Sequence, residues 1–217
     1  MKQPSLLVIL LLTACCGSGQ VHVGLFGGGQ LSRAHYLIFD RNVNKFPQET
    51  RWKYGFQAGA MLRTELEGRL HFAPSIFVSR KGFDVTLDRP AFPPDTSAIA
   101  NDVTLYTLEV APLMQYYLSD EEGVRVFIKG GPSFDLQVSG RETYTTRNGQ
   151  RIARKMKFSY SDYSFMAMNL LVHFGIETPG GWVIFAQYTH GIGGIVNTDS
   201  GPRIFHRAAG LSIGKYF

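Results

Sequence analysis

The sequence has only two cysteines, Cys15 and Cys16, and both lie near its start. If the chain is cleaved after Gly19, the mature protein has no thiol, which excludes disulfide bonds and cysteine-ligated metal sites. No apolar run in the rest of the chain approaches the roughly 20 residues that a transmembrane helix needs. The formal net charge is +5, an excess too small to indicate nucleic-acid binding.

Residues 1–19 have the features of a cleaved signal peptide. Lys2 gives a positive start, and an apolar stretch of the usual length follows. Two cleavage sites are open: after Gly19, where small residues precede the cut, or before Cys15, in a lipoprotein-like Leu-Thr-Ala-Cys motif that would leave Cys15 lipidated. The first is preferred because the first predicted strand begins directly afterwards. Both predict export, so the protein is soluble, attached to a surface or a β-barrel.

The mature chain contains a repeated alternation of apolar and polar residues with a period of two. Such alternation predicts β-strands. The eight segments that show it lie at about 20–31, 54–66, 70–79, 108–118, 124–136, 166–177, 182–189 and 209–217. The only charged residue on the apolar faces is Lys215, near the chain end, where its long side chain reaches a membrane interface.

The connections between these segments alternate in length. Three are tight turns and four are long, the long ones lying at about 32–53, 84–103, 141–162 and 190–204. This is the plan of up-and-down outer-membrane barrels, whose short turns face the periplasm. The predicted fold is all-β: an eight-stranded antiparallel up-and-down transmembrane β-barrel, preceded by a cleaved signal peptide. The signal peptide covers 1–19 and the outer-membrane barrel domain covers 20–217.

Aromatic residues lie near the ends of several predicted strands, as in the girdles of membrane barrels. They are Tyr54, Tyr116, Trp182, Tyr188 and Phe217. Phe217 is also a terminal aromatic residue of the kind that barrel-assembly machinery recognises. Pro74, Pro112 and Pro132 lie inside predicted strands and remove ladder donors. Local bulges or unpaired acceptors are therefore expected there, and the strand register near these prolines is left open.

Charged residues collect on the opposite, polar faces. They are Arg63, Glu109, Arg125, Lys129, Asp135 and Glu177. An eight-stranded barrel is only wide enough for its own side chains, so these three bases and three acids are predicted to pair inside it. This argues against a porin. It also disfavours a soluble lipocalin-like barrel, whose lumen would have to hold an apolar ligand among these charges.

Four stretches resemble the PorT-like outer-membrane β-barrel family of Bacteroidetes. They are 70–82 (LHFAPSIFVSRKG), 105–118 (LYTLEVAPLMQYYL), 128–134 (IKGGPSF) and 211–217 (LSIGKYF). Two departures are the extra Ala111 before Pro112 and Lys215, at a place often held by an apolar or aromatic residue. The resemblance implies an eight-stranded barrel in the outer membrane, and most members have no assigned activity. Its namesake is associated with a secretion system, which implies an alternative role in secretion.

No pattern in the sequence supports a catalytic, cofactor-binding or metal site. The six histidines have no metal-ligand spacing, and no serine lies in a nucleophile-elbow motif. His71 and His173 are expected to point into the barrel as hydrogen-bonded structural residues, although an outer-membrane lipid hydrolase would use them. Gly27-Gly28-Gly29 lacks the helix and lysine of a phosphate loop, and it predicts a flexible point or a bulge.

The predicted function is therefore that of a non-enzymatic integral outer-membrane barrel with a plugged lumen. Its external loops would act in adhesion, partner docking or envelope integrity; the alternative is an accessory component of a type IX-like secretion apparatus. The basic loop at 141–157 is a candidate contact for lipopolysaccharide phosphates, or an ordinary solvated loop. Expected partners are outer-membrane lipid and lipopolysaccharide, the barrel-assembly machinery through Phe217, and a secretion or surface protein, but no nucleic acid.

Overall fold

The computed structural model describes residues 20–39, 45–119, 123–159, 162–196 and 201–217, and it contains twelve strands in one antiparallel sheet. The long strands are β1 (Val21–Phe39), β3 (Lys53–Glu67), β5 (Ser75–Thr86), β6 (Ala98–Ala111), β8 (Arg125–Thr146), β10 (Met166–Glu177), β11 (Trp182–Gly191) and β12 (Arg203–Tyr216). The short strands are β2 (Lys45–Arg51), β4 (Leu70–Phe72), β7 (Met114–Tyr117) and β9 (Arg151–Lys155). Within the described ranges, no helix is long and apolar enough to cross a membrane.

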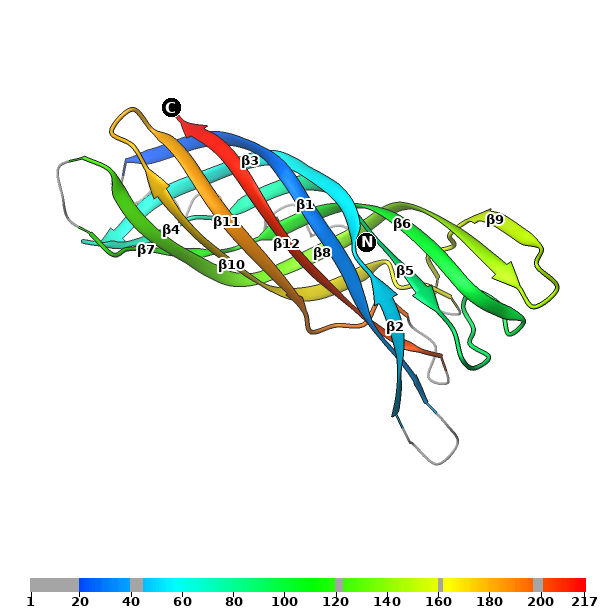
Figure 1. Cartoon of the computed structure of the whole chain (residues 1–217). Helices are drawn as coiled ribbons and strands as arrows, with labels where there is room; N and C mark the ends of the chain where they lie inside the picture. Colours follow the sequence, from blue (N-terminus) through cyan, green and yellow to red (C-terminus); the bar gives the residue numbers. More distant parts are fainter. Residues whose placement is uncertain (1–19, 40–44, 120–122, 160–161, 197–200) are drawn as a thin grey trace, which may run out of the picture.

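The long strands pair in a closed ring. The order is β1, β3, β5, β6, β8, β10, β11 and β12, and β12 pairs back with β1. Figure 1 shows them tilted along one elongated barrel, with red β12 beside blue β1. Closure leaves none of the eight long strands at a sheet edge, which is what a lipid environment requires of β-structure.

The structure has twelve strands where the sequence predicted eight. Part of the difference comes from proline, which has no N–H to donate to the ladder. Pro74 lies between β4 and β5, and Pro112 lies between β6 and β7. Pro132 does not interrupt its strand, because β8 runs through it in register with Leu170 of β10. The predicted irregularity therefore occurs at two of the three prolines.

Two of the predicted long connections are largely strand. β1 and β2 pair as a hairpin within the predicted connection 32–53, and β8 and β9 do the same within 141–162. Both hairpins project from the end of the barrel opposite the tight turns and the C-terminus (Figure 1). Because outer-membrane barrels have short turns on the periplasmic side, we call the hairpin end external. The sheet therefore continues beyond the membrane.

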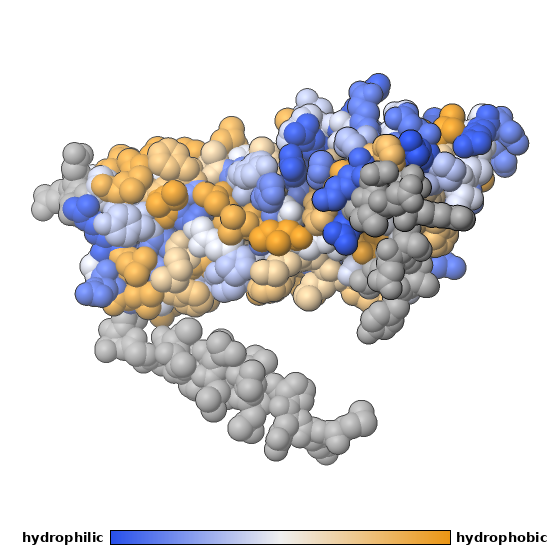
Figure 2. Space-filling view, turned by 90° about the horizontal axis from the view of Figure 1, so that it is seen from below, coloured by the Kyte–Doolittle hydropathy of each residue, from blue (hydrophilic) through white to orange (hydrophobic). Residues whose placement is uncertain are grey.

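The predicted alternation of faces is confirmed. Apolar side chains such as Leu25, Phe174 and Ile184 are exposed on the outside of the barrel, whereas Gln57 and Asn169 are buried inside. Figure 2 shows apolar residues over much of the barrel wall and hydrophilic residues gathered towards the external end. An outward apolar wall with a polar interior is the arrangement of a transmembrane barrel.

Along the longest strands, the apolar face changes sides. In β5, Val78 points outward, but Phe83 and Val85 are buried inside. In β1, Leu31 is exposed on the outside, but Tyr36 is buried. An outward apolar face suits lipid and an inward one suits a water-exposed wall. The change therefore places the external edge of the membrane just beyond Val78 and Leu31.

The glycine triplet does not interrupt β1, so the predicted bulge is wrong. The register of β1 with β3 and β12 is continuous through Gly27, Gly28 and Gly29. A Cβ on Gly28 would lie 2.1 Å from the carbonyl oxygen of Leu211, whereas a Cβ on Gly29 would meet nothing within 4 Å. Gly28 is therefore needed for the close approach of β1 and β12.

We expect Gly28→Ala to lower the free energy of unfolding by about 1–3 kcal/mol, because the added methyl group collides with backbone in a packed site. Gly29→Ala is the matched control, and it should change stability by less than about 0.5 kcal/mol. Urea titrations of the refolded barrel, read as the heat-modifiable gel band, give both values. Equal stability of the two variants would contradict the close contact at Gly28.

Candidate functional site

The interior of the barrel contains a buried ion cluster formed by β5, β6 and β8. The Lys81 Nζ lies 2.7 Å from Glu109 Oε1 and 2.8 Å from Asp135 Oδ2, and all three side chains are 1% exposed. Glu109 also accepts a hydrogen bond from the Ser79 hydroxyl. Glu109 on β6 and Asp135 on β8 lie directly opposite each other on neighbouring strands. Such like charges repel, so the ammonium group of Lys81 is what allows both carboxylates to stay buried.

Lys81 is absent from the set of interior charges predicted from the sequence. The predicted strand ended at Ser79, whereas β5 continues to Thr86. Inward positions follow every second residue from Ser75 through Ser79, and the same spacing leads to Lys81. Extending the period-two pattern by one residue pair would therefore have found it.

A second ion cluster lies near the periplasmic end. Glu177 accepts hydrogen bonds from Arg63, from Arg125 at 2.8 Å and from the Tyr117 hydroxyl at 2.5 Å. The Arg63 guanidinium also lies 4.3 Å from the centroid of the Tyr216 ring. The prediction that interior charges pair holds for Arg63, Arg125 and Glu177, although the sequence assigned no partners, and the acid is held from three sides.

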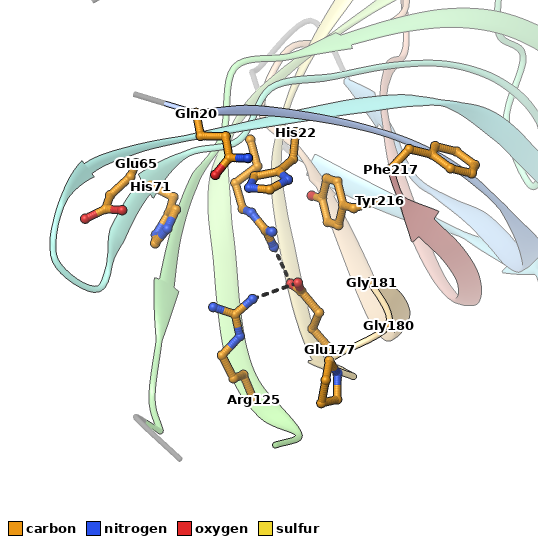
Figure 3. A pocket seen from close by; sticks show the side chains of 12 residues that line it. Gln20, His22, Glu65, His71, Arg125, Glu177, Gly180, Gly181, Tyr216 and Phe217 are labelled. Carbon is orange, nitrogen blue, oxygen red and sulfur yellow. Dashed lines mark hydrogen bonds and ion pairs between the residues drawn. The ribbon is translucent and has the colours of Figure 1, made fainter. Parts of the chain in front are cut away.

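The Glu177 cluster forms part of the wall of a pocket of about 430 Å³ at the periplasmic mouth. In Figure 3 a dashed line joins Glu177 to Arg125, and His22, His71 and Tyr216 surround the opening. His71 Nδ1 lies 3.2 Å from the carbonyl oxygen of Arg69, and the ring meets Tyr117 edge-on. The mouth is therefore polar and already crossed by ion pairs.

Lys129 is not paired with an acid as predicted. Its Nζ donates to the Ser75 hydroxyl at 3.0 Å, and within the described ranges no carboxylate forms an ion pair with it. Lys129 and Asp135 share one face of β8, but six residues of strand separate them by about 20 Å. The acids lie at other levels of the barrel, so the predicted balance of three bases and three acids does not describe the network.

Between the clusters, neutral side chains span the lumen. Gln57 on β3 exchanges hydrogen bonds with Gln187 on β11 and donates to the Ser212 hydroxyl at 2.8 Å. His173 is buried and stacks on Phe185 with ring centroids 4.7 Å apart. Its Nε2 has no hydrogen-bond partner among the described residues, so it packs as an aromatic ring rather than in the predicted hydrogen bond.

The two histidines considered for a hydrolase lie in different surroundings. His71 is at the periplasmic rim and His173 is inside the barrel, and the described side chains form no hydrogen bond between either ring and a serine hydroxyl. The described ranges also hold no group of three or more histidine, cysteine, aspartate or glutamate residues able to bind a metal ion. No catalytic constellation is assembled around these two residues.

Beyond the membrane, the interior becomes an apolar core that the sequence reading missed. It is formed by Ala34, Tyr36, Ile38, Phe83, Val85, Leu87, Ala91, Ala98, Val103, Leu105, Tyr144, Met156, Tyr163, Ala167, Ile195 and Ile204. Several of these residues come from the connections that follow β5, β9 and β11, and we call this folded external end the cap. The signal for this core in the sequence was the pair of apolar residues Phe83 and Val85, which occupy inward positions of β5.

One buried carboxylate organises the cap. Glu142 on β8 is 0% exposed; it accepts hydrogen bonds from Tyr163 at 2.7 Å and Asn101 at 3.1 Å, and it pairs with Arg154. Arg154 also lies 3.8 Å from Asp162. Burial raises the pKa of the Asp162 carboxyl, and the positive charge of Arg154 opposes this rise. Arg154, predicted as a cation of a solvated loop, therefore holds the cap together.

The other cations of the predicted basic loop lie on the surface of the β8–β9 hairpin and the segment after it. They are Arg141, Arg147, Arg151, Lys155 and Lys157, and all are exposed. Arg141 is directly opposite Lys155 in the hairpin register. The exposed cations are thus carried on paired strands that project from the external end.

The closed ring, the outward apolar belt and the polar interior define an integral membrane β-barrel. The family model described as Outer membrane protein beta-barrel domain matches residues 14–197, and the chain belongs to this family. The protein is located in the outer membrane. No curated protein matches the chain.

Several solved structures are similar to the chain over most of its length. Ail of Yersinia pestis, in complex with the heparin analogue sucrose octasulfate, is 16% identical with a TM-score of 0.44, covering 91% of this chain and 99% of Ail. Neisserial surface protein A is 16% identical with a TM-score of 0.39, covering 88% and 95%. The N-terminal barrel of Pseudomonas aeruginosa OprF is 13% identical with a TM-score of 0.34, covering 92% and 100%. Similarities of this size carry no argument about ligands.

Proposed function

We propose that the protein is a non-enzymatic outer-membrane barrel with a plugged lumen that acts through its external end in adhesion, partner docking or envelope integrity. The observation that carries this proposal is the filling of the interior at successive levels. The Glu177 cluster lies near the periplasm, the Gln57 and Lys81 contacts follow, and the apolar core of the cap lies beyond them. The exposed polar groups of the external hairpins are then the surface available to partners.

Within this proposal, the ring of eight long strands makes eight membrane crossings. Residues 1–19 lie outside the described ranges and are proposed to be a signal peptide. The finer assignment to the PorT-like family of Bacteroidetes rests on the four motifs given above. Metabolic labelling with a fatty acid tests the lipoprotein alternative, because only cleavage before Cys15 yields a labelled protein that loses its label in a Cys15→Ala variant.

A plugged lumen predicts that the folded protein does not conduct ions. In planar bilayers, we expect no stable conductance steps, because the Arg63–Glu177 pair crosses the lumen, the Lys81 cluster fills part of it, and buried pairs resist separation. A porin reconstituted in the same way serves as the positive control. Stable single-channel steps from the unmodified protein would overturn the plugged-lumen proposal.

Photocrosslinking in living cells tests the docking role. Crosslinkers at Arg147 and Arg151 lie on the external hairpin, and one at Gln57, which is 1% exposed, is the buried control. Capture of a defined surface protein by the hairpin positions alone supports docking. Capture of a component of a secretion apparatus would instead favour the secretion alternative, and equal capture at Gln57 would contradict both.

A further inference from the structure

A row of basic side chains crosses the outside of the barrel at the external edge of the apolar belt. Arg33 on β1 is directly opposite Arg207 on β12, and Arg207 is directly opposite His190 on β11. The positions two residues nearer the membrane centre are the apolar Leu31 and Ala209. The row therefore lies where the apolar face of β1 ends, which is the level of lipid headgroups.

The two arginines face each other without a balancing acid. Like charges directly opposite in a sheet are destabilising. Among the described residues, no carboxylate forms an ion pair with either guanidinium. The exposed Glu49 on neighbouring β2 forms none with them either. The Arg33 guanidinium lies over the ring of Trp52, 4.7 Å from its centroid. Such a pair at a membrane surface is suited to an external anion, because guanidinium groups bind phosphate through paired hydrogen bonds.

On the membrane side of this row, the barrel wall is hollowed into a groove of about 580 Å³. Small residues on three neighbouring strands, Gly29, Ala186 and Ala209, lie along it, and Leu31, Tyr54 and Leu211 border it. Leu31 pairs with Ala209 on one side and with Tyr54 on the other. The groove thus begins one side-chain repeat, about 7 Å, from the arginine pair.

Gln30 lies behind the floor of the groove, with its side chain inside the barrel. It is 4% exposed and donates through Nε2 to the carbonyl oxygens of Phe56 and Arg80. Its Oε1 has no hydrogen-bond partner among the described residues. Because side chains alternate between the two faces of a strand, this acceptor faces the lumen, and the groove offers a bound acyl chain an apolar surface.

We propose that this wall binds one lipopolysaccharide molecule through its lipid A end, with a phosphate held by Arg33 and Arg207 and an acyl chain lying in the groove. The inference deepens the expected contact with lipopolysaccharide and rests on the proposed orientation of the barrel in the membrane. It moves that contact from the β8–β9 hairpin to the barrel wall. The phosphate and the acyl chain each meet a matching feature within a few residues of one another.

The test is a titration of the purified barrel in detergent micelles with lipid A, with the bound lipid counted by native mass spectrometry. Arg33→Gln/Arg207→Gln removes the phosphate site, and we expect about 10- to 100-fold weaker binding from the loss of charged hydrogen bonds. Ala209→Leu fills the groove while leaving both arginines in place, and it should weaken binding as well. Two control variants should leave binding unchanged. Lys215→Gln removes a cation at the opposite end of β12, and Arg147→Gln/Arg151→Gln removes two cations from the hairpin.

Further ligands separate the sources of the phosphate. Dephosphorylated lipid A should bind the unmodified barrel as weakly as lipid A binds the double variant, and inorganic phosphate should not compete. Phosphatidylglycerol, which has a phosphate but fewer acyl chains to cover the apolar wall, should bind more weakly than lipid A; equal binding would overturn the choice of lipid A.

The heat-modifiable gel band shows whether each variant is folded. If the double arginine variant does not fold, the binding of Ala209→Leu decides whether the site exists. Binding that persists in both wall variants, or that is lost equally in the hairpin variant, would overturn the proposed site. Neither result affects the conductance and crosslinking tests, so failure of this site and failure of the proposed function are distinguishable.

Discussion

We expect Lys81→Met to lower the free energy of unfolding by about 3–5 kcal/mol, because it leaves two facing carboxylates buried without a cation. Glu109 and Asp135 both depend on this one ammonium group, at 2.7 and 2.8 Å. Lys129→Met is the matched control, because it also removes a buried ammonium group from the lumen. Among the described residues Lys129 has only the Ser75 hydroxyl as a partner, so its replacement by an apolar side chain should be neutral or stabilising.

Urea titrations of the refolded barrel in lipid vesicles measure both effects through tryptophan fluorescence and the heat-modifiable gel band. The triple variant Lys81→Met/Glu109→Gln/Asp135→Asn removes the whole ion cluster and should recover much of the lost stability, since no unpaired charge remains. If Lys81→Met and Lys129→Met cost the same, the Lys81 cluster is not what holds this level of the barrel together.

Deletion of Phe217 should sharply reduce the amount of barrel in the outer membrane while leaving the refolded protein nearly as stable as before. The Phe217 side chain is 73% exposed on the outside, and its backbone N–H donates to the Val23 carbonyl at 2.8 Å. Losing one such hydrogen bond costs about 1 kcal/mol, which is small for a closed ladder. A large loss in cells would therefore report on recognition by the assembly machinery and not on stability.

Two substitutions control this experiment. Phe217→Tyr keeps a terminal aromatic residue and should assemble normally, whereas Phe217→Ala should behave like the deletion. Outer-membrane fractions quantified by immunoblot give the amounts in cells, and refolding yield in detergent gives the intrinsic folding efficiency. Normal levels of the deletion variant in the outer membrane would contradict a role for Phe217 in assembly.

The sequence was most informative where lipid imposes a strict rule. A wall that faces lipid must be apolar at every second residue, so Leu25, Phe174 and Ile184 were correctly placed outside and Gln57 inside. The cap was missed for the converse reason. There the rule inverts, and Phe83 and Val85 turn inward while the strand continues. A reading that assumed one apolar face per strand ended β5 too early and lost Lys81 with it.

Features that depend on stagger between strands were beyond the sequence pattern. Period two gives the face of Lys129 but not its height relative to other strands, so its separation from Glu177 on β10 could not be known. The facing of Arg33 and Arg207 depends on the register between the first and last strands, which meet only when the ring closes. Such contacts are set by barrel closure, a long-range property.

The continuity of the long strands from the periplasmic end into the cap has a mechanical consequence. β1 remains paired with β12 from Gly24 to Leu37, and with β3 from Val21 to Ser32. A force applied by a tethered partner at the external end would act along these strands and load their hydrogen bonds side by side, in shear. The bonds would then share the load instead of breaking one after another, so the barrel would serve as a stiff anchor against tension.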